Sequence, residues 1–351
     1  MSTWKILTGD CIEQMRTLPD ASVQCCVTSP PYWGLRDYGH AGQIGLEETP
    51  EAYVARMVEV FREVRRVLRD DGTLWLNLGD SYCGGGGYAP DAPCNKRRAE
   101  GESWGAMNAF STREGEARKK ARPGYTPPGL KAKDLVGIPW RVAFALQADG
   151  WWLRQDIIWA KPNPMPESVT DRCTKAHEYV FLLAKSARYF YDDVAVEEPV
   201  AHPGMAEEAR RRKREGSLGV GAYSTGSGRK DADNYTGGMG FASQRNGRNR
   251  RSVWTITTKP YRGAHFAVMP EALVEPCIKA GSQEGSLVLD PFTGSGTVGA
   301  VAVRLGRQFV GCELNPEYVK LAEQRISEAQ AAQGLFGSTQ PPSPRSGPTT
   351  A

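Results

Sequence analysis

The sequence predicts an α/β fold built on a mostly parallel sheet. Apolar runs of strand length, such as 23–27, alternate along the chain with segments of helical spacing, such as 49–68. Near the C-terminus, residues 286–312 show the pattern of a strand, a glycine-rich turn, a helix and a second strand. Because so short a unit cannot bury a sheet by itself, strands from 4–191 must complete it. We therefore expect the C-terminal unit to insert beside the N-terminal strands.

The individual elements follow from the same patterns and from local punctuation by Gly and Pro. Strands are predicted at 4–7, 23–27, 73–78, 151–159, 179–184, 252–257, 286–290 and 308–312. Helices are predicted at 12–18, 49–68, 138–148, 271–280, 297–304 and 317–329. Residues 189–191 are expected to pair with 179–184 as a hairpin.

Composition limits the class of protein. The 351 residues suffice for one large α/β domain with insertions or for two small domains, and a hydrophobic content of 40% allows a sizeable core. The net charge of +4 is a weak argument for nucleic acid, so the distribution of charge matters more. The eight cysteines form no C-x-x-C pair and indicate small core residues in a reducing compartment. The chain shows no signal peptide and no apolar run of membrane-spanning length, which predicts a cytoplasmic protein without a membrane partner.

The glycine-rich turn after 286–290 has the physics of a nucleotide site. Its glycines let the backbone approach a ligand, and the following helix supplies free N–H groups. Glu313 ends the next strand, where a carboxylate can accept both ribose hydroxyls. Gly294, Gly296 and Gly299 formally match the dinucleotide fingerprint. However, Asp290 would repel a pyrophosphate and attract an ammonium, which favours S-adenosylmethionine over a dinucleotide.

The segment Thr-Ser-Pro-Pro-Tyr-Trp at 28–33 has a second chemical character. It follows a predicted buried strand, and its two prolines remove two backbone donors and stiffen the chain. Carbonyls and the Ser29 hydroxyl are left to accept hydrogen bonds beside the Tyr32 ring. Such a pocket could hold an exocyclic amino group and stack on a flat base. The alternative is a strand-ending turn with a core aromatic.

Together, Asp-Pro-Phe-x-Gly-Ser-Gly-Thr at 290–297 and Thr-Ser-Pro-Pro-Tyr at 28–32 resemble the amino-group DNA methyltransferases, which modify N4 of cytosine or N6 of adenine. The catalytic motif precedes the cofactor loop, an order similar to the family's β class. The resemblance covers 1–83, 134–195 and 252–327. It implies a Rossmann-like methyltransferase fold with circularly permuted motif order, irregular basic insertions, and S-adenosyl-L-methionine as cofactor.

The resemblance also implies roles for particular residues. The expected catalytic residues are Ser29, Pro30, Pro31 and Tyr32, and the expected cofactor-binding residues are Asp10, Cys11, Phe266, Asp290, Phe292, Gly294, Gly296, Thr297 and Glu313. The residue chemistry leaves alternatives open at two of these positions. Asp10 is equally suited to be the N-cap of the following helix, and Phe266 to be a hydrophobic staple.

The expected reaction is direct methyl transfer from the sulfonium to an exocyclic amino nitrogen. Hydrogen bonds from the amino group to the Ser29 hydroxyl and the Pro30 carbonyl would favour a more tetrahedral nitrogen, so positioning and charge stabilisation carry the catalysis. The base must leave the duplex to reach this pocket, with Tyr32 stacking on it. No metal is required.

Two irregular regions interrupt the predicted fold. The expected organisation is a catalytic half at 1–83 and 134–196, a basic Gly-rich insertion at 84–133, a target-recognition region at 197–251, a cofactor half at 252–330 and a disordered tail at 331–351. The expected DNA contacts are Lys161, Arg210, Arg211, Arg212, Arg248 and Arg250. The alternative for these residues is a solvated charged surface.

Several functional alternatives stay open. Serine at position 29 favours cytosine N4 over adenine N6. Carbon-5 methylation needs a cysteine nucleophile, for which Cys94 in the insertion is a weak candidate. A protein or RNA methyltransferase and an inactive DNA-binding relative are further alternatives. Double-stranded DNA is the expected partner, whereas a homodimer and a cognate restriction endonuclease are left undecided.

Overall fold

The strands join in one sheet in the computed structural model, which describes residues 3–35, 40, 42–83, 126–199, 247–258 and 268–336. Within these ranges the sheet has eight strands in the order β1-β8-β7-β2-β3-β5-β4-β6. The strands are β1 (Trp4–Thr8), β2 (Val23–Thr28), β3 (Leu68–Leu78), β4 (Trp152–Ala160), β5 (His177–Ala184), β6 (Val253–Thr255), β7 (Leu287–Asp290) and β8 (Gln308–Glu313).

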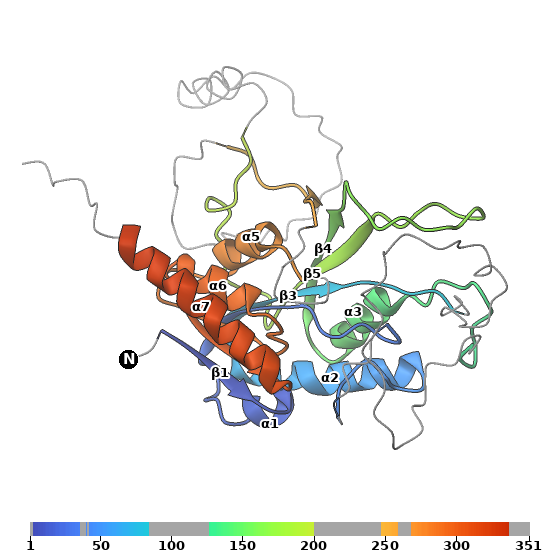
Figure 1. Ribbon diagram of the computed structural model, residues 1–351, viewed down its shortest axis with the longest axis horizontal. Coiled ribbons are helices and arrows are strands. Elements are labelled where there is room, and N and C mark those ends of the chain that lie inside the picture. Colours follow the sequence, from blue (N-terminus) through green and yellow to red (C-terminus); the bar gives the residue numbers. More distant parts are fainter. Residues whose placement is uncertain are drawn as a thin grey trace, which may run out of the picture.

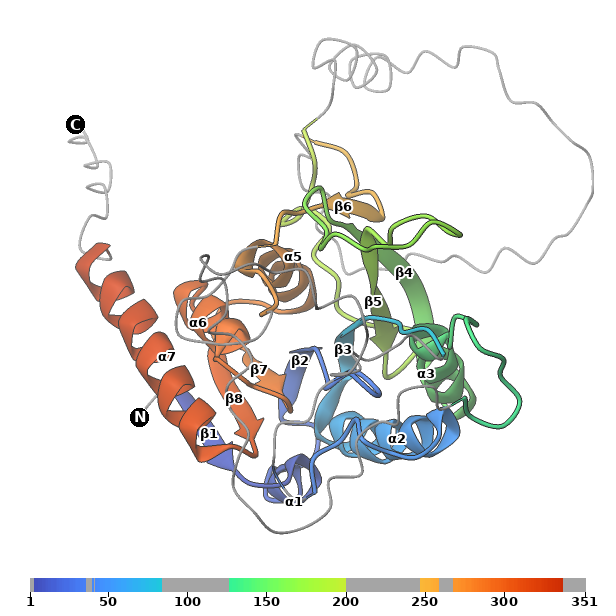
Figure 2. The same cartoon turned by 45° about the vertical axis from the view of Figure 1, so that its right-hand side comes forward.

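The pairing confirms a mostly parallel sheet. Strands β1, β8, β7, β2 and β3 are parallel neighbours in that order. Strand β5 runs antiparallel to both β3 and β4, and β6 is parallel to β4. The C-terminal strands β7 and β8 therefore lie between β1 and β2, so the predicted insertion of the C-terminal unit into the N-terminal sheet is confirmed (Figure 2).

Helices cover both faces of this sheet (Figures 1 and 2). The described helices are α1 (Cys11–Met15), α2 (Pro50–Val67), α3 (Ile138–Ala148), α5 (Glu271–Gly281), α6 (Thr297–Arg304) and α7 (Pro316–Phe336). One hydrophobic cluster joins α1, α2 and α3 to one face, and a second joins α5, α6 and α7 to the other. Helix α2 begins where the Thr49 hydroxyl accepts a hydrogen bond from the Ala52 N–H, with Pro50 in its first turn. None of the helices in the described ranges is both long and apolar enough to cross a membrane.

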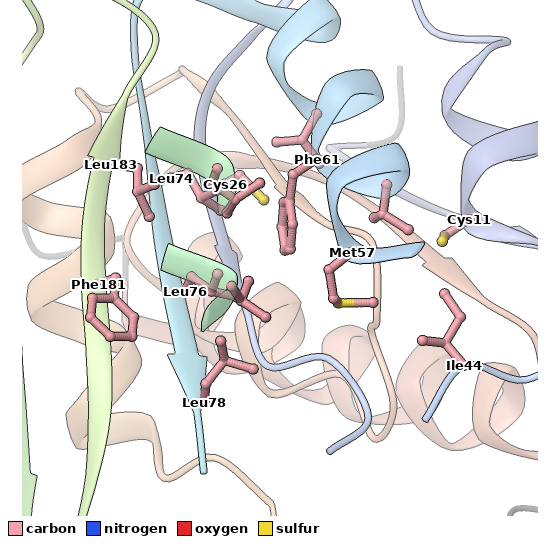
Figure 3. Packing of buried hydrophobic residues seen from close by; sticks show 14 of the residues in the cluster. Cys11, Cys26, Ile44, Met57, Phe61, Leu74, Leu76, Leu78, Phe181 and Leu183 are labelled. Atoms are coloured by element: carbon pink, nitrogen blue, oxygen red, sulfur yellow. The ribbon is translucent and has the colours of Figure 1, made fainter. Parts of the chain in front are cut away.

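The first cluster shows how the central strands are held. Met57 and Phe61 of α2 point toward Leu74 and Leu76 of β3 (Figure 3). All four side chains are fully buried. On the opposite face, Trp75 of the same strand belongs to the second cluster. From Thr73 to Leu78 this strand is thus buried on both faces, which is why Leu74, Trp75 and Leu76 are consecutive apolar residues rather than alternating ones.

The last described helix, α7, makes hydrogen bonds to the start of the edge strand β1. Gln330 of α7 donates from Nε2 to Thr3 Oγ1 at 3.0 Å and accepts from Trp4 Nε1 at 2.9 Å. The start of β1 and the later part of α7 therefore lie close together. This pairing also positions β8, because β1 is its neighbour.

Several expectations about elements differ from the structure. Strand β3 starts at Leu68, immediately after α2, rather than at Thr73. The predicted strand 189–191 is wrong, because β3 and β4 already occupy both edges of β5 and the Tyr189 and Tyr191 rings pack on the second cluster. Helix α7 continues to Phe336, beyond the start expected for the tail, and later residues lie outside the described ranges.

Candidate active site

The two motifs singled out in the sequence meet at neighbouring strand ends. Strand β2 pairs with β7 in parallel, with Cys25 opposite Val288 and Cys26 opposite Leu289. At the carboxyl end of this pair, Thr28 Oγ1 donates a 2.6 Å hydrogen bond to Asp290 Oδ1. Segments 28–33 and 290–297 are consequently side by side.

Asp290 is the most perturbed acid at this junction. Its side chain is 3% exposed, and Oδ1 accepts a second hydrogen bond, from the Phe292 N–H at 3.0 Å. Burial raises the pKa of Asp290 to about 7, although the hydrogen bonds from Thr28 and Phe292 oppose the shift. The carboxyl group therefore changes charge near neutral pH. Its Oδ1 joins the two motifs, because it accepts hydrogen bonds from Thr28 and from the Phe292 N–H.

The glycine-rich turn brings Glu313 against its backbone. Gly294 and Gly296 have φ angles of 51° and 78°, in the left-handed region that favours glycine. Glu313 accepts from the Gly294 N–H at 2.8 Å and from the Asn315 N–H at 2.9 Å. Burial raises the pKa of Glu313, and these backbone hydrogen bonds partly offset the shift. A carboxylate at the end of β8 thus lies directly beside the turn, a position that fits the ribose of the expected cofactor.

Two glycines of this region also serve packing. A Cβ on Gly296 would lie 2.8 Å from Ala322 Cα, and one on Gly299 would lie 2.4 Å from Ile326 Cδ1. Both contacts are with α7. The third glycine of the dinucleotide fingerprint is therefore needed for the approach of α7 to α6, and its presence carries no information about a pyrophosphate.

Thr297 and Phe292 are engaged inside the protein. The Thr297 hydroxyl accepts from Arg325 at 2.8 Å, and its side chain is 3% exposed. Arg325 also donates to Glu271 at 3.0 Å, so Thr297 belongs to a polar network between α5, α6 and α7. Phe292 is partly buried against the first hydrophobic cluster. Only the backbone of Thr297, at the start of α6, is placed to serve a ligand in the turn.

Asp10 is the N-cap that the sequence left open. Its Oδ1 accepts from the Ile12 N–H at 2.9 Å and the Glu13 N–H at 3.1 Å, and Oδ2 pairs with Arg56 at 3.2 Å. Because β1 and β8 are parallel neighbours, Asp10 also follows the strand end beside Glu313. The capping role and a position near the cofactor turn coexist.

Cys11 begins α1 in the first hydrophobic cluster and is 7% exposed. Burial, assisted by the neighbouring charge of Asp10, raises the pKa of its thiol to about 12. Cys25, Cys26 and Cys312 are likewise buried, as expected for small core residues. In the described part of the chain, no group of three His, Cys, Asp or Glu side chains is placed to hold a metal ion.

The Tyr32 hydroxyl lies in a polar cluster at the end of β3. Tyr32 Oη donates to Glu178 Oε2 at 2.7 Å, has Asn77 Oδ1 at 3.2 Å, and lies 3.5 Å from Ser29 Oγ. Burial raises the pKa of Tyr32 well above its usual value, and the Glu178 charge adds to the shift, so the hydroxyl stays protonated as a donor. A Cβ on Gly79 would lie 2.5 Å from Tyr32 Cε2, so the ring rests against a glycine.

The prolines of this motif have different environments. Pro30 is buried, whereas Pro31 is half-buried and its carbonyl accepts from Tyr53 Oη at 2.9 Å. Tyr53 belongs to α2 and is fully buried. Ser29 is half-buried at the mouth of the cluster. Helix α2 therefore fixes the main chain after β2 and leaves the serine and the tyrosine at the surface of the site.

Glu178, Asn77 and Gly79 were missed in the sequence. Glu178 is the second residue of β5, which is antiparallel to β3, with Asn77 opposite Val180 and Leu78 opposite Tyr179. The start of an antiparallel strand lies beside the end of its neighbour. An acid at the start of a predicted strand was a signal that could have been used, but only with the pairing known.

Lys161 points into the same cluster instead of toward solvent. Its ammonium forms an ion pair with Glu178 and lies 4.2 Å from the centroid of the Trp159 ring. The Lys161 and Glu178 side chains are 17% and 16% exposed. In the structure this lysine, which the sequence predicted as a DNA contact, is paired with Glu178 of the same chain.

Arg248 and Arg250 also have intramolecular partners. Arg248 pairs with Glu198 at 3.2 Å, and the Arg250 guanidinium lies 4.6 Å from the centroid of the Trp254 ring. Arg248 remains exposed, while Arg250 is half-buried. Five residues named from the sequence lie outside the described ranges. These are Cys94, Arg210, Arg211, Arg212 and Phe266.

The adjacency of the two motifs agrees with the similarity of this sequence to known DNA methylases. A family model described as DNA methylase, for N6- and N4-specific enzymes, matches residues 23–324. The chain belongs to this family. It is an S-adenosylmethionine-dependent DNA methyltransferase of α/β fold, and the resemblance drawn from the two motifs is confirmed.

Curated relatives match along nearly their whole length. The Type II methyltransferase M.SmaI of Serratia marcescens is 45% identical over 322 residues, which cover 92% of this chain and 90% of the relative. The Type II methyltransferase M.XycI of Xanthomonas campestris pv. cyanopsidis is 48% identical, over 92% of this chain and 87% of the relative. The methylase therefore extends over most of this chain, including both of its motif segments.

Solved structures share the fold. The cytosine-N4-specific PvuII DNA methyltransferase superposes with a TM-score of 0.57 at 17% identity, over 95% of this chain and 93% of that one. A DNA modification methylase from Thermus thermophilus, solved with S-adenosyl-L-methionine, gives a TM-score of 0.50 at 22% identity, over 93% and 95%. The predicted Rossmann-like methyltransferase architecture is confirmed by these neighbours.

Proposed function

We propose that this enzyme methylates N4 of cytosine at a specific site in double-stranded DNA, on a base flipped out of the helix. The observation that supports the proposal is the Thr28–Asp290 hydrogen bond, which joins the segment of Ser29 and Tyr32 to the glycine-rich turn. Serine at the first motif position favours cytosine. The PvuII enzyme that shares the fold is named as cytosine-N4-specific, which supports the same base. Adenine N6 is the second candidate, since the family includes both specificities.

The residues around the turn fit S-adenosylmethionine. Glu313 lies beside Gly294 and is suited to accept hydrogen bonds from the ribose hydroxyls. Asp10 follows the adjacent strand end, on the side proposed for the adenine. The ionised form of Asp290 is suited to attract the methionine ammonium, and Phe266 is proposed to pack on that end. When bound, the cofactor supplies the methyl group on its sulfonium.

On the base side, the chain supplies acceptors and a flat surface. The exocyclic nitrogen is a weak nucleophile because its lone pair is delocalised into the ring. Hydrogen bonds from its hydrogens to the Ser29 hydroxyl and the Pro30 carbonyl would favour a tetrahedral nitrogen with an available lone pair. Tyr32 would stack on the flipped base and hold it in line with the methyl group.

Contacts with the duplex are proposed from charge. Arg210, Arg211 and Arg212 fall in the region proposed for target recognition and would neutralise phosphates. Arg248 is exposed and is proposed to contribute as well, whereas Arg250 packs on Trp254.

The relatives named as Type II methyltransferases support a proposed cognate restriction endonuclease, and we propose a cytoplasmic enzyme.

Mass spectrometry of nucleosides tests the proposal. Unmethylated bacterial DNA is incubated with the enzyme and labelled S-adenosylmethionine, then digested to nucleosides. The expected product is labelled N4-methylcytosine. Labelled N6-methyladenine would transfer the assignment to the second candidate, and 5-methylcytosine or label confined to protein would contradict the proposed chemistry.

The variant Tyr32→Ala tests the base pocket in the same assay. We expect turnover to fall about a hundredfold or more, because the base loses its stacking surface and its alignment. Cofactor affinity, measured by calorimetry, should change little, since the residues proposed to bind the cofactor lie on other segments of the chain. Turnover near the wild-type value would show that Tyr32 does not bind the base.

A further inference from the structure

The Glu178–Lys161 ion pair has no assigned role in the reaction, yet it contacts the hydroxyl of the proposed stacking ring. Tyr32 Oη donates to Glu178 Oε2 at 2.7 Å, and Lys161 pairs with Oε1 of the same carboxylate. We propose that Glu178 and Lys161 are positioning residues that fix the Tyr32 ring plane for the flipped base. This inference rests on the proposed function, in which Tyr32 stacks on the base.

The geometry selects Glu178 as the partner of the hydroxyl. Tyr32 has one hydroxyl hydrogen and two nearby acceptors, Glu178 at 2.7 Å and Asn77 Oδ1 at 3.2 Å. The shorter contact is to a carboxylate, and hydrogen bonds to charged acceptors are the stronger ones. Asn77 Nδ2 donates to the Tyr179 carbonyl at 3.0 Å and to Glu178 at 3.3 Å, so the amide supports the carboxylate.

Lys161 offsets the free-energy cost of placing the Glu178 carboxylate in a half-buried position. A buried carboxylate is costly unless it is paired and hydrogen-bonded. Lys161 supplies the pairing charge and lies over the Trp159 ring at 4.2 Å. The indole is itself fixed, because Trp159 Nε1 donates to the Ile256 carbonyl at 2.8 Å. A chain of contacts thus links Trp159 of β4 to Tyr32 through Lys161 and Glu178.

Together with Gly79, the pair constrains the ring along one edge and at the hydroxyl. Gly79 leaves room for the edge of the Tyr32 ring, with a hypothetical Cβ at 2.5 Å from Cε2. Glu178 holds the hydroxyl. A stacking ring fixed in advance keeps the bound base aligned with the methyl group, so its effect should appear in the chemical step. The expected signature is a fall in kcat with little change in the KM for DNA.

The test is a double-mutant cycle with Tyr32→Phe and Glu178→Gln. Each single variant should lower kcat about tenfold to a hundredfold, the rate equivalent of one hydrogen bond to a charged group. The double variant should be no slower than the slower single variant, because both remove the same interaction. The control is Glu167→Gln, which removes an ion pair with Arg172 in the same β4–β5 connection and should leave kcat unchanged.

Lys161→Met separates positioning from a DNA contact. Positioning predicts a lower kcat with an unchanged salt dependence of DNA binding, whereas a phosphate contact predicts a higher KM and a salt slope flatter by about one. The first result supports the inference. The second overturns the role proposed for Lys161.

Unchanged kcat in Tyr32→Phe or Glu178→Gln, or additive losses in the double variant, would overturn the positioning pair. Melting temperature and cofactor affinity report whether each variant is folded, and if Glu178→Gln is not, Tyr32→Phe alone decides. Failure of the proposed function is distinguishable, since it appears in the wild-type enzyme as a different methylated product.

Discussion

At the scale of single residues, Asp290 combines structural and chemical roles. Its buried carboxyl group accepts from Thr28 on β2 and from the Phe292 N–H of its own turn. Burial raises its pKa to about 7 from an ordinary value of 3.8. The folded protein therefore keeps a proton that the unfolded chain releases between these values. Stability falls as pH rises through this window and is constant above it.

The variant Asp290→Asn should remove this pH-dependent loss of stability. We expect its melting temperature to exceed that of the wild type by a few degrees at pH 8, where Asp290 is charged. At pH 5 the advantage should be smaller, because the wild-type carboxyl group is then neutral in the folded state. Calorimetry at both pH values measures the difference. An equal shift at the two pH values would contradict the raised pKa.

Residues inside a continuous motif were predictable, whereas residues brought by strand pairing were not. Ser29, Asp290 and Glu313 were named from local chemistry, and the structure brings the first two to adjacent strand ends. Glu178 and Asn77 reach the Tyr32 hydroxyl through antiparallel pairing of β5 with β3, which no local pattern specifies.

At the scale of elements, one acid joins three helices. Glu271 of α5 accepts from Arg304 of α6 at 2.8 Å and from Arg325 of α7 at 3.0 Å. Burial alone would raise the pKa of Glu271, but these two arginines lower it overall. A lowered pKa contributes stability above the ordinary value of 4.5 that is lost as pH falls through the folded value. The helices behind the cofactor turn are thus held by charge as well as by packing.

The variant Arg325→Met should weaken this junction. We expect a melting temperature a few degrees lower at pH 7, because Glu271 and Thr297 both lose a donor. The gap to the wild type should narrow as pH falls below the ordinary pKa of Glu271, because its carboxyl group then becomes protonated. Lys279→Met is the control, since it removes an ion pair with Glu275 along the surface of α5. A similar loss in both variants would contradict a special role for the junction.

Helices and central strands were predictable because their apolar periodicity is strong. The predicted α3 and α6 agree with the structure to the residue, at Ile138–Ala148 and Thr297–Arg304. The start of β3 was not predictable, because no turn separates it from α2 and Gly72 imitates a break. The strand expected at 189–191 failed because its pattern is short and the sheet offers it no free edge beside β5.

At the scale of the whole molecule, the sheet order explains the order of motifs. Strands β7 and β8 lie between β1 and β2, and α7 returns to β1, where Gln330 contacts Thr3 and Trp4. The sequence predicted that the C-terminal unit joins the N-terminal strands. It could not predict the strand pair that receives it, because parallel pairing leaves no local signal.

A circular permutant tests this contact between α7 and β1. A chain that begins at Lys259, runs to Phe336, continues through a short flexible linker to Thr3 and ends at Thr258 should fold to the same sheet. Its ends would fall between β6 and α5, and the linker would join the end of α7 to Thr3, which Gln330 of the same helix contacts. We expect cofactor affinity within about tenfold of the wild type by calorimetry.

The control permutant opens the chain between Leu74 and Trp75, inside β3, and should not fold because the central strand is cut. Failure of the first permutant to fold, as expected for the control, would contradict the closeness of α7 and β1.

The Thr28–Asp290 hydrogen bond also has an evolutionary consequence. A relative that replaced the threonine by a residue without a hydroxyl would leave a buried acid with one donor fewer, at a cost that is hard to tolerate. A relative that replaced the acid by a residue without an acceptor would leave the hydroxyl unpaired. Substitutions at these two positions, 262 residues apart in the chain, are therefore expected to have been inherited together, so that the two motifs diverge as one unit.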